Sequence, residues 1–320
     1  MTAPRLQDLP PLRRRRRRRL RDLKNVPVLP SLVTLGNVFF GFLAIAKVAD
    51  ALRVSAADAP FAEVVGYFEM AVILVFVAML FDALDGRIAR MTNQTTSFGA
   101  QLDSMADMVT FGVVPAFIGK VLVDWHARDA NSLLMPHPKI YYVAAAIYVL
   151  CAALRLARYN VETGEREEDH REFRGLPSPA AAAVICSMVA LLCTRYDEQS
   201  LSSYLLSQEH FDVLIRVMPL VLGTLGLLMV SRVPYPHAMH MVLKQRHSFP
   251  FLAGLVVLIF MAAIEWQLAI LVLTVGYVIW GVLLGLVRLL TSGRLDGGRG
   301  VDDDDDDDLD VEVRHNPTLN

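Results

Sequence analysis

Long apolar runs, separated by short polar segments, fill the chain between residues 30 and 290. An α-helix needs about 20 apolar residues to cross the hydrocarbon core of a bilayer, and eight runs come close to that length. Because backbone groups in lipid must find their hydrogen bonds within the helix, the pattern predicts an all-α integral membrane protein, a polytopic bundle of about eight transmembrane helices. The expected spans are 32–49, 64–88, 104–123, 140–158, 178–195, 212–230, 249–264 and 267–289.

Charge divides the chain further. The sequence is 54% hydrophobic and its net charge is only −2, but the N-terminus is basic and the C-terminus acidic. A run of like charges repels itself, so we expect two disordered arms, residues 1–29 with Arg13 to Arg19 and residues 292–320 with Asp302 to Asp308. Between them we expect a membrane core over 30–230 and two peripheral membrane helices over 231–291. Beside a membrane span, the arginine run favours anionic lipid headgroups over nucleic acid.

The distribution of Lys and Arg also predicts orientation, because cytoplasmic loops carry more of both. The N-terminal arm and alternate loops are rich in them, while the opposite loops are poorer. Both termini and the polar stretch near residue 90 are therefore expected on the cytoplasmic side of the cell membrane, the inner or plasma membrane.

Four aspartates stand where two of the apolar runs meet a connecting loop. Asp82 and Asp85 are spaced i,i+3, and Asp103 and Asp107 are spaced i,i+4, so each pair shares one helix face. A charged residue in a membrane helix costs roughly 2.5–3.5 kcal/mol on insertion scales, so such residues usually mark a functional site. Carboxylates without Cys or His ligands suit Mg²⁺ or Mn²⁺, and four of them can hold two ions.

These residues carry a resemblance to a known family. The pattern D-x2-D-G-x2-A-R-x8-G-x3-D-x3-D is met at every defined position, and it is similar to the signature of the CDP-alcohol phosphatidyltransferases. The resemblance implies a six-helix core, a membrane-embedded cytoplasmic cavity and a homodimer. The matching residues are Asp82, Asp85, Gly86, Ala89, Arg90, Gly99, Asp103 and Asp107.

Further segments resemble the phosphatidylserine synthase branch, namely 103–116, 155–160, 173–180 and 231–235. That branch transfers the phosphatidyl group of CDP-diacylglycerol to L-serine and releases CMP. The resemblance implies that all four aspartates bind two metal ions and that Asp107 is also the general base. It further implies that Gly86, Arg90 and Thr96 hold the CDP-lipid.

Two assignments stay open between a structural and a functional role. Asn37, one turn after Thr34 in the first span, either bonds a neighbouring helix or contacts the nucleotide-lipid. Arg155 and Arg158 either anchor the fourth span at the cytoplasmic surface or bind the serine carboxylate.

Two other functions are also compatible with parts of the pattern. The acceptor alcohol can be inositol phosphate or glycerol phosphate in place of serine. Alternatively, the aspartates can line an ion path through a transporter, although that reading leaves Gly86, Arg90 and Gly99 without a role.

Overall fold

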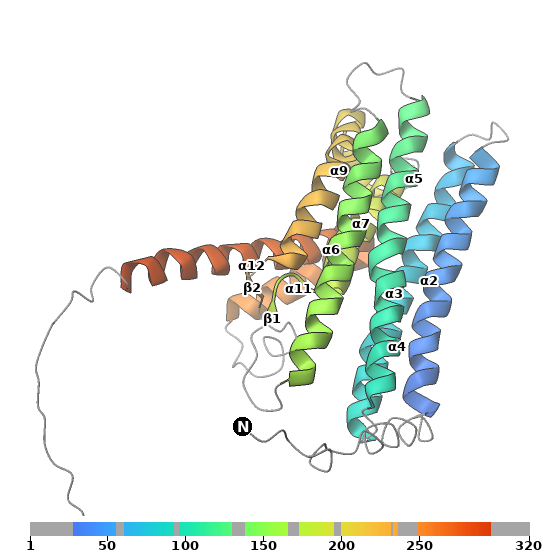
Figure 1. Ribbon diagram of the computed structural model, residues 1–320. Coiled ribbons are helices and arrows are strands. Elements are labelled where there is room, and N and C mark those ends of the chain that lie inside the picture. The colour runs from blue at the N-terminus through green and yellow to red at the C-terminus, as the bar shows by residue number, and fades with distance from the viewer. Residues whose placement is uncertain are drawn as a thin grey trace, which may run out of the picture.

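The fold is a bundle of long apolar helices (Figure 1). The structure is a computed structural model that describes residues 28–55, 61–92, 96–129, 138–165, 173–194, 200–231, 233–235 and 249–295. Within these ranges, six helical segments are long and apolar enough to cross a membrane. They are 29–55, 63–89, 98–125, 139–161, 209–230 and 266–287. The chain is thus a multi-pass membrane protein, as the apolar runs predicted. Both charged runs, Arg13 to Arg19 and Asp302 to Asp308, lie outside the described residues.

The remaining two predicted spans form shorter helices, so the expected count of eight is not confirmed. They are α7 (Ser178–Cys193) and α11 (Phe249–Ile264), each of 16 residues. Almost all of α7 is buried by other helices, whereas most described residues of α11 are exposed. A 16-residue helix rises only about 24 Å, which is less than the hydrocarbon thickness of a typical bilayer.

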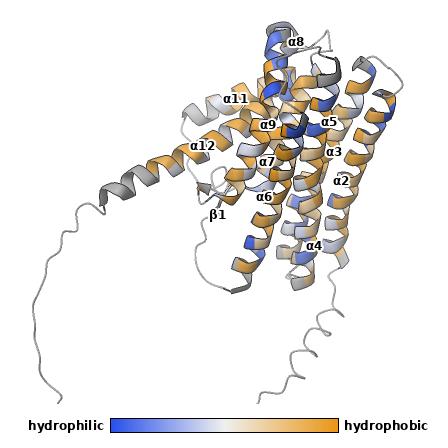
Figure 2. Ribbon diagram, turned by 45° about the horizontal axis from the view of Figure 1, so that its top comes forward, coloured by the Kyte–Doolittle hydropathy of each residue, from blue (hydrophilic) through white to orange (hydrophobic). Residues whose placement is uncertain are grey.

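The long helices pack upright and side by side (Figure 1). Helix α2 (Val28–Ser55) packs most extensively on α3 (Phe61–Met91). Helices α5 (Val114–Asp129) and α6 (Pro138–Glu165) follow, and α9 (Gln208–Val230) packs on α6. Most of the helical residues are apolar (Figure 2), and large apolar side chains are exposed on the outside of the bundle as well as buried in its interior. Such a surface is stable only against lipid or another apolar partner.

A small antiparallel pair joins two segments that are distant in sequence. Strand β1 (Phe173–Arg174) pairs with β2 (Pro234–Tyr235), with Phe173 opposite Tyr235. Gly175 follows β1 with φ of +93°, a region that residues with a Cβ rarely adopt. Its amide donates to the Val233 carbonyl at 2.9 Å, and a Cβ at this position would overlap the Met229 carbonyl oxygen. The glycine therefore allows the loop to close over the end of α9.

The C-terminal hairpin is formed by α11 and α12 (Trp266–Leu295) and crosses the upright helices at a steep angle (Figure 1). Glu265, at the turn of the hairpin, is buried. Its carboxylate accepts hydrogen bonds from the Ser200 hydroxyl at 2.7 Å and the Ser202 amide at 3.2 Å. These two serines lie at the start of the short helix α8 (Leu201–Leu205). A buried carboxylate needs such donors. Glu265 therefore fastens the hairpin to the core at the turn.

Candidate active site

The last turns of α3 carry the first pair of acids. Their spacing of three residues places Asp82 and Asp85 on one face of the helix. Asp85 is buried and Asp82 is partly buried, although the helix ends only two turns later. Gly86 follows directly, and a side chain there would meet open space within 4 Å. The backbone of this turn is therefore accessible from the side of Gly86.

A capped helix holds the second pair. Helix α4 (Ser97–Asp107) begins after Thr96, whose hydroxyl accepts a hydrogen bond from the Gly99 amide at 3.1 Å. Asp103 lies one turn before the C-terminal end of α4, and Asp107 is its last residue. A Cβ on residue 99 would lie 3.3 Å from the Thr96 hydroxyl, a tight contact. Thr96 and Gly99 thus fix the start of the helix that presents both acids.

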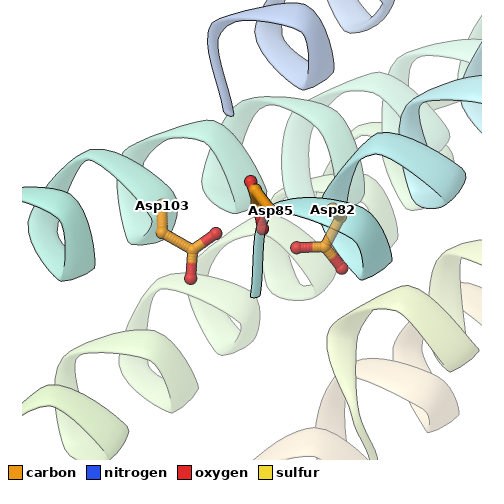
Figure 3. A group of neighbouring side chains, drawn as sticks. All are labelled: Asp82, Asp85 and Asp103. Atoms are coloured by element: carbon orange, nitrogen blue, oxygen red, sulfur yellow. The ribbon is translucent and has the colours of Figure 1, made fainter. Parts of the chain in front are cut away.

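The two helices bring the acids into one space. Asp82, Asp85 and Asp103 each offer a carboxylate oxygen, and the three oxygens lie within 4.8 Å of one another. Figure 3 shows the carboxylates of Asp82 and Asp103 pointing toward each other with Asp85 between them. The Asp107 carboxyl is close enough to Asp82 to share a hydrogen bond. All four predicted acids therefore meet.

This arrangement fits divalent cations. One oxygen each of Asp85, Asp103 and Asp107 is buried without a hydrogen-bond partner among the described residues. Buried carboxylates at this separation repel one another, and each also loses hydration. The available donors are hard carboxylate oxygens, which suit Mg²⁺ and Mn²⁺ better than zinc. Bound cations would offset the repulsion among the four carboxylates.

A polar face of α2 lines the same region. The Thr34 hydroxyl donates to the Pro30 carbonyl at 3.1 Å and also lies within hydrogen-bond reach of Asp85. Asn37, one turn further, is fully buried, and neither atom of its side-chain amide has a partner within the described part of the chain. Bonding to a neighbouring helix therefore does not account for the Asn37 amide. A buried amide without a protein partner makes Asn37 a candidate contact for a bound ligand.

A π-helical segment, η2 (Met108–Val113), follows Asp107 directly, and a proline explains it. In an α-helix the amide of residue 115 would donate to the Phe111 carbonyl, but Pro115 has no N–H and its ring would clash with that carbonyl. Tyr148 of α6, which is fully buried, donates its hydroxyl to the Phe111 carbonyl at 2.9 Å instead. π-Helical turns are frequent at functional sites. Here the turn sets the rotation of α4 relative to α5.

Arg155 of α6 is a cation close to the acids. Its guanidinium acts electrostatically on Asp82 and Asp107, and one of its nitrogens donates to the Ser178 hydroxyl at 2.7 Å. Ser178 is the fully buried first residue of α7. Arg158, three residues later, is partly buried. The side chain of Arg90 is not among those that the structure describes.

Sequence reasoning missed three of these contributors. The Ser178–Arg155 hydrogen bond lies within two segments noted for their resemblance, but nothing in their spacing pairs them. Tyr148 was hidden among apolar residues of the fourth span, although a proline four residues after Phe111 signals an orphaned carbonyl. The Ser104 hydroxyl, which donates to the Asn160 side-chain oxygen at 3.0 Å and links α4 to α6, also lies within two such segments, but nothing in their spacing pairs these residues either.

Comparison with known proteins agrees with this geometry. A family profile described as CDP-alcohol phosphatidyltransferase matches residues 27–229. The chain belongs to the CDP-alcohol phosphatidyltransferase family. The match covers the helices that carry all four acids, as the aspartate pattern predicted. It ends before the C-terminal hairpin.

Several relatives have more specific names. The chain is 31% identical over 210 residues to a CDP-diacylglycerol–serine O-phosphatidyltransferase of Helicobacter pylori, covering 66% of this chain and 72% of the relative. It is 33% identical over 168 residues to the Saccharomyces cerevisiae protein of the same name, covering 51% and 53%. It is 36% identical over 162 residues to the archaetidylserine synthase of Methanothermobacter thermautotrophicus, covering 50% and 56%. Enzymes of this family generally depend on divalent metal ions, consistent with the acidic cluster.

Proposed function

We propose that this chain transfers the phosphatidyl group of CDP-diacylglycerol to the hydroxyl group of L-serine, giving phosphatidylserine and CMP. Serine is proposed as the acceptor because relatives from a bacterium and a yeast, at 31% and 33% identity, share the name CDP-diacylglycerol–serine O-phosphatidyltransferase. The reaction type is supported independently by four acids that converge at the end of two membrane helices.

The reaction is a direct displacement at the lipid-side phosphorus. The serine oxygen forms the new P–O bond, the P–O bond to CMP breaks, and CMP leaves with the electron pair. Asp107 takes the proton of the serine hydroxyl as general base. It is the acid at the junction between α4 and the π-helical turn, beside Asp82 and within the field of Arg155.

Asp82, Asp85, Asp103 and Asp107 together would hold two ions, Mg²⁺ or Mn²⁺. Asp82 and Asp103 would contact both, Asp85 would complete one site and Asp107 the other. When bound, the ions would supply positive charge against the pyrophosphate and the departing CMP. The all-oxygen donor set and its three unpartnered buried oxygens support this assignment.

The CDP-lipid would lie against Gly86, Arg90, Thr96 and Asn37. The open space beside Gly86 and the unsatisfied amide of Asn37 support two of these assignments. Thr96 already caps α4 through its hydroxyl, so its effect on the lipid would come at least partly through that helix. Arg155 would bind the serine carboxylate, with Arg158 as the alternative, because Arg155 is the arginine near Asp107.

Several features of the whole protein belong to the same proposal. The enzyme would work as a homodimer in the cell membrane, with the acidic cluster and both termini facing the cytoplasm. Its four parts would be a basic arm over 1–29, the core over 30–230, two membrane helices over 231–291 and an acidic tail over 292–320.

An acceptor panel tests the proposal. The purified protein in mixed micelles with CDP-diacylglycerol and Mg²⁺ or Mn²⁺ is offered L-serine, inositol phosphate or glycerol phosphate in separate reactions. CMP release and the lipid product are both measured. We expect serine to give the highest rate and phosphatidylserine as product. Faster CMP release with another alcohol would show that this alcohol, and not serine, is the acceptor. Ion flux through reconstituted vesicles without CMP release would show that the protein is not an enzyme of this type.

A further inference from the structure

Helix α6 runs along the segment that carries the second pair of acids, in the opposite direction. Near its middle, Tyr148 donates its hydroxyl to the Phe111 carbonyl of η2 at 2.9 Å. Three turns later, the Asn160 side chain accepts a hydrogen bond from the Ser104 hydroxyl of α4 at 3.0 Å. These two contacts define the register between the segments, so the residues between them on α6 lie beside the residues between them on α4 and η2.

Arg155 lies between these contacts on α6. It follows Tyr148 by seven residues, which is two helical turns and the same face. Ala152 on this face approaches Gly112 of η2, where a Cβ would lie 3.4 Å from the Ala152 Cβ. In the same register, Asp107 lies between the two contacts on the opposite segment. The hydrogen bonds on either side therefore place Arg155 beside the last of the four acids.

The Arg155 guanidinium is held by a neutral group. One of its nitrogens donates to the Ser178 hydroxyl at 2.7 Å, and Ser178 is fully buried. Within the described ranges, Arg155 forms no salt bridge with a carboxylate. A guanidinium has five N–H donors in a fixed planar geometry, so one bond to a hydroxyl fixes its orientation and leaves a fork for an anion. The charge is thus oriented without being neutralised.

Ser178 is itself fixed by the loop that precedes α7. The Gly175 amide donates to the Val233 carbonyl at 2.9 Å, and the Leu176 amide donates to the Leu228 carbonyl at 3.0 Å. Both bonds fasten the loop to the end of α9 and to the residues just after it. Helix α7 then begins at Ser178 and is buried by other helices along almost its whole length. The hydroxyl is therefore a fixed point to which the longer, more flexible arginine side chain is bound.

We propose that Ser178 is a positioning residue for the acceptor: its hydroxyl holds the Arg155 guanidinium beside Asp107, in the orientation that receives the carboxylate of the incoming alcohol. Like the carboxylate contact of Arg155, this role rests on the proposed function. It makes the loop before α7 and its attachment to α9 part of the structure that selects an acidic acceptor.

The test is Ser178→Ala, which leaves the guanidinium without its acceptor. KM for L-serine should rise about tenfold, the lower end of the effect of a hydrogen bond to a charged group. KM for CDP-diacylglycerol should stay unchanged. A rise in KM for CDP-diacylglycerol in place of that for serine would overturn the proposal, because Arg155 would then hold the pyrophosphate.

The matched control is Ser187→Ala on the same helix. Ser187 is also fully buried, and its hydroxyl lies 3.2 Å from the Thr274 hydroxyl of α12. This variant also removes a buried hydroxyl that contacts another helix, so it measures the effect of a less stable α7 alone. It should change neither KM, and melting temperatures of both variants show how far each is destabilised. Equal kinetic changes in the two variants would reduce Ser178 to a structural role.

An Arg155→Ala background separates positioning from direct binding. If Ser178 acts only through Arg155, then Ser178→Ala leaves kcat/KM for serine unchanged in that background. A further fall there would show that the hydroxyl contacts serine itself and would overturn the positioning role, as would wild-type serine kinetics in the single variant. Each of these results leaves the proposed function intact, since that fails only if the wild-type enzyme forms no phosphatidylserine from serine.

Discussion

Removing the Tyr148 hydroxyl should destabilise the bundle at the π-helical turn. In the wild type this hydroxyl is the donor for the Phe111 carbonyl, at 2.9 Å and in a fully buried position. Tyr148→Phe leaves that carbonyl without a donor, because Pro115 has no N–H to offer and no water is available in a membrane interior. A buried polar group without a partner costs about 1–3 kcal/mol, so we expect a loss of stability of this size.

A double-mutant cycle tests the explanation as well as the size of the effect. In a Pro115→Ala background the amide of residue 115 can return to the Phe111 carbonyl, so Tyr148→Phe should cost less than half as much there. The four proteins are compared by thermal or denaturant unfolding in one detergent. An equal cost in both backgrounds would refute the role of the proline, and a cost below about 0.3 kcal/mol in the wild-type background would refute the importance of the hydrogen bond.

Three other changes have defined outcomes. Asp82→Asn and Asp103→Asn should each abolish CMP release, as should EDTA. Mg²⁺ or Mn²⁺ should raise the melting temperature of the wild type more than that of either variant. Full turnover in metal-free enzyme would contradict this prediction. Gly175→Ala should cost about 1–3 kcal/mol of stability because its φ is +93°, whereas a similar change at the open Gly223 should cost little. Glu265→Ala should cost about 1–3 kcal/mol by leaving the donors at the start of α8 unpaired, and Glu265→Gln, which keeps an acceptor oxygen, should cost less in the same unfolding assay.

Much of the site could be predicted from the sequence because its information is local. The i,i+3 and i,i+4 spacing of the aspartates places each pair on one face whatever the rest of the bundle does. Their meeting in space was an inference from two adjacent helices, and the carboxylate oxygens within 4.8 Å confirm it for Asp82, Asp85 and Asp103. The long apolar runs likewise predicted the helical membrane fold, since lipid leaves the backbone few other choices.

The remaining features depend on contacts between distant segments, and no local pattern encodes those. Ser178 and Arg155 are 23 residues apart, and Tyr148 and Phe111 are 37 residues apart. Hydropathy alone also did not distinguish α7, which other helices bury, from a lipid-facing span of full length. The hairpin was expected to be peripheral because the family resemblance implies a six-helix core, but Glu265, an acid within an apolar stretch, already signalled a buried partner.

The hydrogen bond between Ser187 and Thr274 has a consequence for biosynthesis. The two residues are 87 positions apart, so a ribosome that adds about 5–20 residues per second makes Thr274 roughly 4–17 s after Ser187. During that interval Ser187 is not left unpaired, because its hydroxyl also donates to the Val184 carbonyl of its own helix at 2.9 Å. The Ser187 hydroxyl of α7 can therefore stay hydrogen-bonded in the membrane until the last two helices have been synthesised and inserted.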